Sequence, residues 1–527
     1  MCNNIRLADE TLEKIKVMSI PSLTLILVFL ISRLLGYALL FKVNIKLNKC
    51  RFNHLFAVAL FGFFCMGQIT YANPVVGSVQ NSRFRQLDNT MLFFDYHKQT
   101  LSKDRQFYTY PHRNNAFVTD FVENEGNSLI CYTNSIKYWG VLHSYAFAVS
   151  PKLGLNYSGD DVTADTIWPG VDGGAYLRGF VDSIDFDLDV RVYEEKHSNP
   201  TIKTKGYDIR GHIGFNYAWT RFSLSRDVLH WGPGYYNNLV FNQNAPLYNM
   251  VNLELTFGPL HVFSAYANLY EGGFEKKVNE RNLYAHRYEL AFDGLTLGVS
   301  EIQLLYGENK PWLFTPVVPL FIEKGNYTEE VNNGALAIDV NYHFFQHMRL
   351  YGEFFLDDMV SPVALYENKY SNNRWAVMFG AQFAYDVLVG SRLLQFGSIS
   401  EVARIEPYTY CHYDFAPALF AHQGAPLGNP NGPNSLVVDW IFYGKYWLYG
   451  KSNVFVGVHN KWKWKGDDNG SDIYDSYKTE RKRFARNARL HYSLMPVINF
   501  RGEHFGFSGE YAFFDGYYVD VRMMFMM

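Results

Sequence analysis

Cysteine is scarce in this chain, with five in 527 residues, and charged residues make up only 19% of it. So few cysteines exclude a disulfide-stapled scaffold, and we expect Cys131 and Cys411, the two that follow residue 72, to be unpaired thiols. The mean hydropathy is slightly negative, which excludes a helical membrane protein.

Catalytic and metal-binding motifs are also missing. The sequence has no His-Glu-x-x-His stretch, no Gly-x-Ser-x-Gly elbow and no cysteines spaced for zinc. Gly232-Pro233-Gly234 lacks the Lys and Ser/Thr that would follow in a phosphate-binding loop. We therefore predict no catalytic residue, no metal site and no cofactor. A barrel hydrolase with a site assembled from distant rim residues stays as a minor alternative.

Aromatic residues, in contrast, are abundant, with 39 Tyr and 43 Phe among the 17% of residues that are aromatic. Few soluble proteins carry so much aromatic surface. Large transmembrane barrels do, because Tyr and Trp girdle both membrane interfaces while the lumen is polar.

The first 72 residues are separable from the rest. Pro21–Phe41 is apolar and long enough to span a bilayer. A basic stretch follows it, then the short apolar run Leu55–Met66 and the small residue Ala72, which together have the layout of a secretory signal. We predict a signal peptide over 51–72, cleaved after Ala72. Residues 1–50 are either a real extension or an over-called start.

Charge argues against one class of partner. The chain has a net charge of −3, and its first 72 residues hold eight Lys and Arg against three Asp and Glu. Residues 73–527 therefore carry a net charge of −8. A mildly acidic chain without a basic surface stretch predicts no nucleic-acid partner.

Period-2 alternation dominates the sequence beyond about residue 140. Apolar side chains occupy one face of each stretch and frankly charged ones the other. The clearest examples are Ile184–Val192, Val251–Phe257, Tyr288–Phe292 and Leu350–Leu356. Such strands fit a sheet that lies between lipid and water.

Connections between these strands alternate between short turns and long Gly-, Asn- and Pro-rich segments. The long ones are 156–174, 227–248, 307–332, 357–373 and 417–435. This asymmetry is typical of outer-membrane barrels, which must close because an open sheet edge in lipid leaves backbone groups unpaired. A soluble propeller or sandwich explains the alternation, but not the leader, the aromatic content or the loop asymmetry.

We therefore predict an all-β, antiparallel transmembrane barrel over 141–527, with sixteen to eighteen strands and eighteen favoured. Residues 73–140 lack clean periodicity, and we predict that they form a periplasmic cap or a plug.

Alternation also predicts that a set of charged side chains points into the lumen: Arg287, Glu289, Arg349, Glu353, Asp357, Arg404 and Glu406. Two interpretations stay open. The charges form either a mutually paired polar filling, in which opposite charges offset the cost of desolvation, or a vestibule that binds or passes a solute.

A break in the alternation singles out Glu301. Leu297 and Val299 belong to one face, yet Ile302 and Leu304 continue it with the opposite parity. A one-residue bulge next to Ser300 would explain this and would re-aim Glu301 as a site residue; a bulge that only curves the barrel is the alternative.

The long connection after Arg226 combines aromatic and amide side chains around a stiff turn. Pro233 fixes φ, and the flanking glycines allow sharp turns. Aromatic rings near amides suit sugars, whose C–H faces stack while their hydroxyls need donors and acceptors. Loop self-packing or an aromatic belt is the simpler alternative. Alternation along the strand points Arg226 at lipid, as an anchor of the loop.

Several ordered stretches resemble the capsule assembly Wzi family of outer-membrane proteins. They are Arg226-x4-Trp231-Gly232-Pro233-Gly234, Ala285-His286-Arg287-x-Glu289-Leu290, Glu301 with Tyr306-Gly307, Pro316-x2-Pro319-Leu320, Leu350-Tyr351-x-Glu353-x3-Asp357-Asp358, Glu401-x2-Arg404-Ile405-Glu406-Pro407-Tyr408 and His422-x-Gly424-x-Pro426-Leu427-Gly428. Together they cover roughly 210–435.

This resemblance implies an eighteen-stranded barrel acting as a surface lectin that retains capsular or exopolysaccharide. The helical periplasmic bundle associated with the family is not evident in 73–140, where Pro111, Asn114, Asn115 and Gly126 interrupt any helix. A contact with polysaccharide-export machinery is therefore left open.

We conclude from the sequence that the chain is a non-enzymatic barrel of a Gram-negative outer membrane that binds polysaccharide. Its ring and hydroxyl contacts are assigned to Trp231, Tyr235, Tyr236 and His422. The supporting polar network in the lumen or rim is assigned to Arg226, Arg287, Glu289, Glu301, Arg349, Glu353, Asp357, Arg404 and Glu406. The alternative is a porin-like channel for small solutes or oligosaccharides.

Overall fold

A computed structural model describes most of the chain beyond residue 129. The described residues are 109–110, 130–138, 141–159, 168–181, 183–196, 203–242, 245–271, 278–292, 294–307, 309–323, 332–345, 347–358, 374–390, 392–412, 418–448, 453–475, 484–501, 505–512 and 518–526. The predicted signal peptide and residues 1–50 lie outside them. No helix within these ranges has the length and apolar character that a membrane crossing requires.

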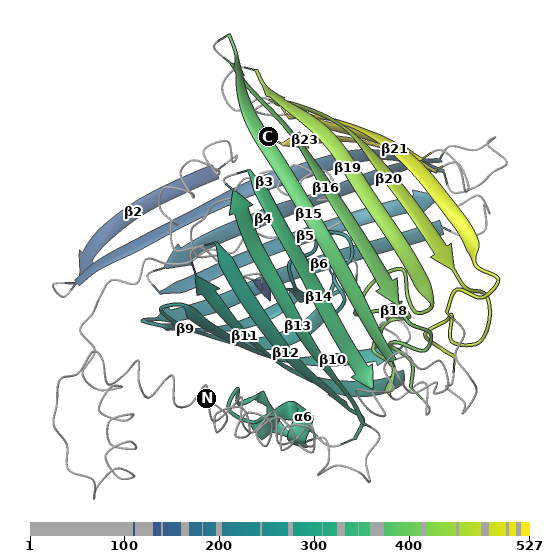
Figure 1. The fold of residues 1–527 in the computed structure, drawn as a ribbon. Helices are drawn as coiled ribbons and strands as arrows, with labels where there is room; N and C mark the ends of the chain where they lie inside the picture. The colour runs from purple at the N-terminus through teal and green to yellow at the C-terminus, as the bar shows by residue number, and fades with distance from the viewer. Residues whose placement is uncertain are drawn as a thin grey trace, which may run out of the picture. The chain divides into compact units, whose positions relative to one another are not determined.

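Antiparallel strands pair in sequence order, and the last returns to the first, so the sheet is a closed barrel (Figure 1). Its strands are β3 (Val141–Gly159), β4 (Trp168–Val181), β5 (Ile184–Lys196), β6 (Lys203–Tyr217), β7 (Thr220–Asp227), β9 (Tyr248–Phe257), β10 (Leu260–Glu271), β11 (Val278–Phe292), β12 (Leu295–Leu305), β13 (Asn332–Phe345), β14 (Met348–Asp358), β15 (Arg374–Val389), β16 (Arg392–Ile405), β19 (Ser435–Trp447), β20 (Asn453–Lys465), β21 (Arg489–Arg501), β22 (Phe505–Ala512) and β23 (Tyr518–Met526).

Counted over the described residues, eighteen strands make this ring, within the predicted range. β2 (Ile130–Tyr138) lies outside the cycle and pairs with the first half of β3, while β23 pairs with its second half. Three short elements lie in the connections: β8 (His230–Trp231), β17 (Ala421–His422) and β18 (Ala425–Pro426). A fourth, β1 (Thr109–Tyr110), precedes the barrel in sequence and pairs with β8. Two small helices, η1 (Pro311–Phe314) and α6 (Leu320–Glu323), follow β12.

Turn lengths alternate around the ring, as predicted. Two-residue turns such as Ala218-Trp219 and Gly258-Pro259 join strands at one end. The connections at the other end range from about six residues, as in 197–202, to twenty or more, as in 228–247, 306–331 and 406–434. Most of 156–174, which we predicted as a long connection, belongs instead to β3 and β4. One long segment of this end, 466–488, was not singled out from the sequence. We call the two ends the short-turn end and the long-loop end.

The two faces of the barrel differ sharply in polarity. Large apolar side chains such as Ile213, Phe222 and Phe379 are 51%, 41% and 65% exposed on the outer face. Aromatic pairs such as Trp219–Phe257 and Trp462–Tyr492 lie near the two ends of this face. Along β5, β6 and β7 the residues that alternate with the apolar ones point inward and are mostly polar, as expected for a wall between lipid and a polar lumen.

Candidate functional site

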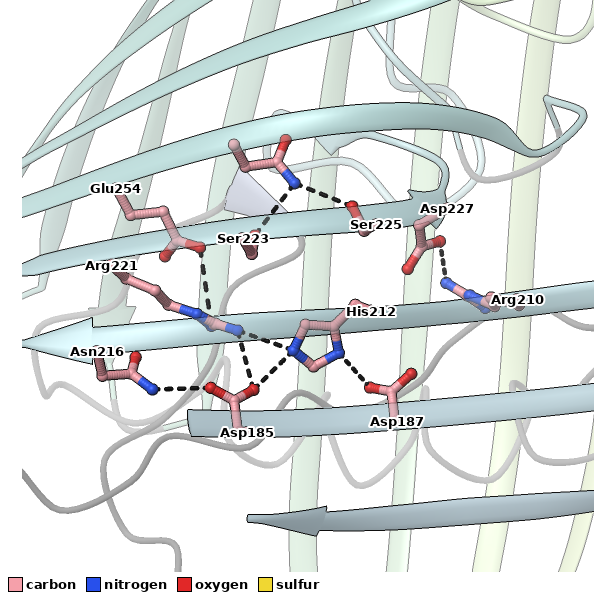
Figure 2. A network of polar contacts seen from close by, with 11 residues as sticks. Asp185, Asp187, Arg210, His212, Asn216, Arg221, Ser223, Ser225, Asp227 and Glu254 are labelled. Atoms are coloured by element: carbon pink, nitrogen blue, oxygen red, sulfur yellow. Dashed lines mark hydrogen bonds and ion pairs between the residues drawn. The ribbon is translucent and has the colours of Figure 1, made fainter. Parts of the chain in front are cut away.

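The inner wall carries a lattice of paired charges, which begins on β5, β6 and β7 (Figure 2). The ring of His212 lies between two carboxylates, 2.6 Å from Asp185 and 2.7 Å from Asp187. Arg221 donates to Asp185 at 3.0 Å. All four side chains are buried. The Asp185 carboxylate pairs with the Arg221 guanidinium, and the His212 ring contacts both carboxylates, so these contacts offset part of the cost of desolvating the buried groups.

The lattice continues around the wall onto β11 and β13. Arg287 forms a bidentate pair with Asp339, at 2.7 and 3.0 Å, and also contacts Glu289 at 2.7 Å. All three side chains are fully or almost fully buried. The inward orientation of Arg287 and Glu289 is thus as predicted, and of the two open interpretations the paired filling describes these residues.

The segment that follows β7 folds into the lumen and is held there by charged side chains of the wall. Glu401 accepts hydrogen bonds from the backbone amides of Tyr235 at 2.6 Å and of Tyr236 and Asn237 at 3.0 Å. Glu353 accepts the amide of Leu239 at 2.8 Å. We call residues 228–242 the plug loop. Polar side chains of the wall thereby replace the water that loop amides need.

Arg349 binds the other side of the plug loop. Its guanidinium donates to the carbonyl of Pro233 and, at 2.9 Å, to the side chain of Gln382. The same guanidinium lies over the Tyr351 ring, 4.2 Å from its centroid. Both Arg349 and Glu353 were predicted to point inward, and their role in the structure is to hold the loop.

Three of the four side chains assigned to sugar contacts are buried by this packing. Trp231 and His422 are fully buried, and Tyr235 is 5% exposed. Trp231 packs edge-on against Phe241 and Phe263. Only Tyr236 is partly exposed; it stacks on His459, with ring centroids 4.6 Å apart. The simpler alternative, loop self-packing, therefore describes Trp231 and Tyr235.

A second segment, between β16 and β19, covers the plug loop. The Tyr410 hydroxyl donates to the carbonyl of Leu239 at 2.8 Å. The amide of Tyr410 donates to Asp357 at 2.9 Å, so this predicted inward carboxylate also supports a loop. His422 contacts the carbonyl of Leu247 at 3.2 Å, and burial lowers the pKa of His422 to about 4. The imidazole is therefore neutral at physiological pH.

The predicted bulge at Glu301 is absent. β12 pairs with β11 and β13 without a register shift on either side of Ser300. Ile302 and Leu304 point into the lumen and are apolar because they pack in the same buried cluster as the plug loop. Glu301 points outward, but the segment carrying η1 and α6 covers it, and the Leu320 amide donates to it at 3.2 Å.

Arg404 and Glu406 were predicted to point into the lumen, and Arg404 instead points outward. It has the same parity in β16 as Val402, which is 43% exposed, while Ile405 on the opposite parity is buried. Arg404 contacts Glu406 at 2.7 Å and lies over the Phe484 ring. Arg226 also points outward, as its parity predicted, and donates to the carbonyl of Ile209 at 3.0 Å.

One inward-facing group was missed from the sequence. Lys461, Lys463 and Lys465 share the inward parity of the buried Phe455 on β20, and Arg489 and His491 lie opposite them on β21. Lys461 and Lys463 are partly exposed, and Arg489 and His491 are exposed. We call these five residues the basic strip. It runs from the long-loop end towards Tyr236 and His459. The repeat Lys461-Trp462-Lys463-Trp464-Lys465 was the available signal.

Acidic residues limit the charge of this strip. Asp439 contacts His459 at 2.8 Å and accepts a hydrogen bond from Asn237 at 2.8 Å. Arg489 lies 3.9 Å from Asp467 in an exposed pair. Arg489 and His491 are the exposed side chains of the basic strip, and Lys463, opposite His491, is partly exposed.

Neither a disulfide nor a metal site is found in the part of the chain that the structure describes. Cys411 is free and buried, as predicted, and its thiol contacts the carbonyl of Asp472 at 3.1 Å. The Cys131 side chain lies outside the described residues. No group of three His, Cys, Asp or Glu side chains within those residues could hold a metal ion.

Comparisons with known proteins bear on the fold. No family profile and no curated protein matches the sequence. Among solved structures the chain resembles Wzi, described as an outer-membrane protein of Escherichia coli involved in group 1 capsule assembly and a carbohydrate-binding β-barrel, with a TM-score of 0.50 and 13% identity over 72% of this chain and 84% of that one.

Two other similarities are weaker. Pseudomonas aeruginosa OprD has a TM-score of 0.39 at 13% identity, covering 72% of this chain and 94% of that one. A Rh. blastica porin mutant has a TM-score of 0.31 at 10% identity, covering 72% and 100%. The chain folds as an outer-membrane β-barrel. At these identities the similarity concerns the fold alone.

Proposed function

We propose that this protein is a non-enzymatic outer-membrane barrel that binds and retains capsular or exopolysaccharide at the cell surface. The observation that carries the proposal is the plug loop, whose backbone is held by Glu353, Arg349 and Glu401 inside the lumen. A diffusion pore needs an open lumen. A barrel whose buried carboxylates hold a loop inside the lumen is better suited to present a fixed surface for binding.

The binding site that we propose lies where the plug loop meets the basic strip. Tyr236 offers a partly exposed ring, stacked on His459, and Lys463 and His491 line the approach from the long-loop end. Aromatic faces bind the C–H faces of sugar rings, and ammonium groups bind carboxylate or phosphate substituents. The proposed ligand is therefore an acidic polysaccharide. Tyr235 would support this surface, because its amide binds the same Glu401 carboxylate as the amide of Tyr236. Trp231 and His422 pack elsewhere in the loops.

Retention of labelled capsule on cells tests the proposal. We expect Tyr236→Ala to reduce retention about ten-fold, since one stacked ring contributes on the order of 1–2 kcal/mol. Tyr385→Ala, which removes a ring exposed on the outer face near the short-turn end, is the matched control. Equal retention by both variants, with equal insertion, would contradict the assignment of Tyr236.

A porin-like channel is the second candidate, because inward side chains of the basic strip remain exposed. In planar bilayers a steady, large conductance with anion preference would favour this candidate. We also propose that the segment around Thr109 and Tyr110 serves as a plug, since these two residues pair with Trp231 and His230 of the plug loop. β2, in contrast, pairs with the wall strand β3. Contact with export machinery is proposed only through the similarity to the capsule assembly protein.

A further inference from the structure

The segment that follows β12 folds back onto the outer wall of the barrel. Its helix η1 packs on β10 and β11, and α6 packs on β11, β12 and β13. Leu313 and Leu320 are fully buried there, in a cluster with Tyr284 and Leu305 of the wall. We call residues 309–323 the strap. The strap therefore belongs to the surface that the barrel presents to the membrane, whereas the plug loop lies inside the lumen.

Polar side chains on the outer face hold the backbone of the strap. Ser264 donates to the carbonyl of Phe314, and Tyr288 donates to the carbonyl of Pro316 at 2.6 Å. Glu301 accepts the amide of the first residue of α6. These wall residues are polar on a face that elsewhere is apolar. They supply hydrogen-bond partners that the strap backbone would otherwise take from water.

The backbone of the strap offers few donors that need water. Proline, which has no N–H group, occupies three of the twelve positions from 311 to 322. Four of the other amides bind carbonyls of the strap itself, namely those of Leu313, Thr315, Val318 and Ile322. In hydrocarbon, backbone groups must find their partners within the protein. The donors of the strap are largely removed or paired, as such a position requires.

The strap covers the wall at the depth of the hydrocarbon. A strand tilted by about 40° gains about 2.5 Å of height per residue. Ser264 is the fifth residue of β10 and Glu301 the seventh of β12, counted from the short-turn end. They therefore lie about 10 and 15 Å above that end, within an apolar band that is about 25 Å tall in barrels of this kind.

The side of the strap that faces away from the wall is apolar. No charged residue occurs from 311 to 322, and Trp312 and Val317 are 51% and 82% exposed. Lys310 precedes this stretch, and its ammonium lies over the Trp312 ring, 5.9 Å from the centroid. An exposed apolar surface is unfavourable in water and favourable in hydrocarbon. A tryptophan beside a lysine is typical of the headgroup level.

The contacts also orient the strap along the membrane normal. The Lys310 amide binds the Tyr284 hydroxyl, and the Pro316 carbonyl binds Tyr288, which lies four residues nearer to the short-turn end of β11. The start of the strap is therefore the higher part, and Val317 lies deeper than Lys310. Long loops of outer-membrane barrels lie on the extracellular side, so the strap enters from the outer leaflet.

We propose that the strap is a lipid-binding surface inserted in the outer leaflet. Val317 contacts acyl chains, and Trp312 with Lys310 lies at the boundary to the headgroups. Lipid is the occupant because the exposed side chains are apolar and the backbone donors are largely paired. This surface lies on the outer wall, so the proposal does not depend on polysaccharide binding in the lumen.

Photo-cross-linking in intact outer membranes tests this contact. Benzoyl-phenylalanine replaces Val317 in the full-length protein, Phe379 on the exposed wall as the lipid-facing control, or Tyr474 in a long loop as the aqueous control. Mass spectrometry of the purified protein then identifies the adducts. We expect lipid adducts at position 317 in a yield similar to that at 379 and about ten-fold above that at 474, because the probe reacts only with groups in contact.

The same experiment detects the other possible occupants. A covalent dimer or an adduct with another protein as the main product at position 317 would overturn the proposal. A lipid yield at position 317 no higher than at 474 would overturn it as well.

A charge at this position gives an independent readout in lipid nanodiscs. Val317→Asp should detach the strap, because acidic side chains are unfavourable on a lipid-facing surface, and should accelerate hydrogen exchange at the Leu320 amide about ten-fold relative to Val317→Ala. Slow exchange in β12 of both variants would show that the barrel is intact. Equal exchange of the Leu320 amide in the two variants would show that Val317 does not face hydrocarbon and would contradict the proposal.

Discussion

Glu401 accepts hydrogen bonds from three consecutive backbone amides of the plug loop, and it also accepts the Tyr351 hydroxyl at 2.8 Å. A carboxylate suits this position because it accepts hydrogen bonds and donates none. The neutral amide of glutamine has the same shape but presents an NH₂ group to amides that also donate. The position therefore distinguishes Glu from Gln by chemistry and not by size.

We predict that Glu401→Gln loosens the plug loop without unfolding the barrel. Each buried amide left without an acceptor costs about 1–3 kcal/mol. Hydrogen exchange at the amides of Tyr235, Tyr236 and Asn237 should accelerate at least ten-fold, while exchange in β12 and β13 stays slow. Unchanged protection of the three amides would show that Glu401 does not hold the loop.

His422 makes the second loop sensitive to acid. Burial lowers its pKa to about 4, and Arg281 and Arg226 act in the same direction. A released loop would have an ordinary histidine pKa near 6.5. Because the docked form binds fewer protons, its docking is fully stable above about pH 6.5 and weakens as the pH falls from there towards 4.

The expected result is faster hydrogen exchange at pH 5 than at pH 7.5, after correction for intrinsic rates, at the Gln423 and Leu427 amides. These amides bind the carbonyls of Tyr270 and Phe420 in the docked loop. His422→Gln, which cannot be protonated in this range, should reduce that pH dependence. A variant with the same pH dependence as the wild type would assign the effect to other groups, such as His230, whose pKa burial also lowers to about 4.

At the scale of elements, the plug loop depends on one glycine. Gly232 has a φ of 105°, a value that side chains rarely tolerate, and a Cβ at this position would lie 2.9 Å from the Glu353 carboxylate. The glycine therefore allows both the turn and the close approach of the acceptor that holds Leu239.

Gly232→Ala should displace the plug loop and raise single-channel conductance several-fold over the wild type. The control is Gly258→Ala, in a short turn with a φ of 60° and no atom within 4 Å of the added Cβ. Equal conductance of Gly232→Ala and the wild type would mean that the loop tolerates the change or that its position does not limit the pore.

Across the whole molecule, alternation predicted the barrel because lipid outside and charge inside impose opposite polarities on the two faces. It placed Arg287, Glu289, Arg349 and Glu353 correctly, since they face the lumen where it is polar. It failed near the long-loop end. There the plug loop makes inward residues such as Ile302 and Ile405 apolar.

In the same region, segments that cover the outer wall allow charged residues on the face that elsewhere is apolar. Glu301 is buried under α6, and Arg404 lies over Phe484, so both charges point away from the lumen. The alternation in a sequence reports the polarity of the groups that a strand face contacts. It does not report whether that face points to the lumen or to the lipid. Partners from distant segments, such as Glu401 with the plug loop, leave no local pattern.

Polysaccharide binding is tested most directly by the affinity of purified native acidic polysaccharide for the full-length protein in detergent, measured at low and high salt. We predict binding that weakens with salt, is reduced about ten-fold by Tyr236→Ala or Lys463→Gln, and is unchanged by Tyr385→Ala. Absence of binding, together with a large open-pore conductance of the wild type, would contradict it.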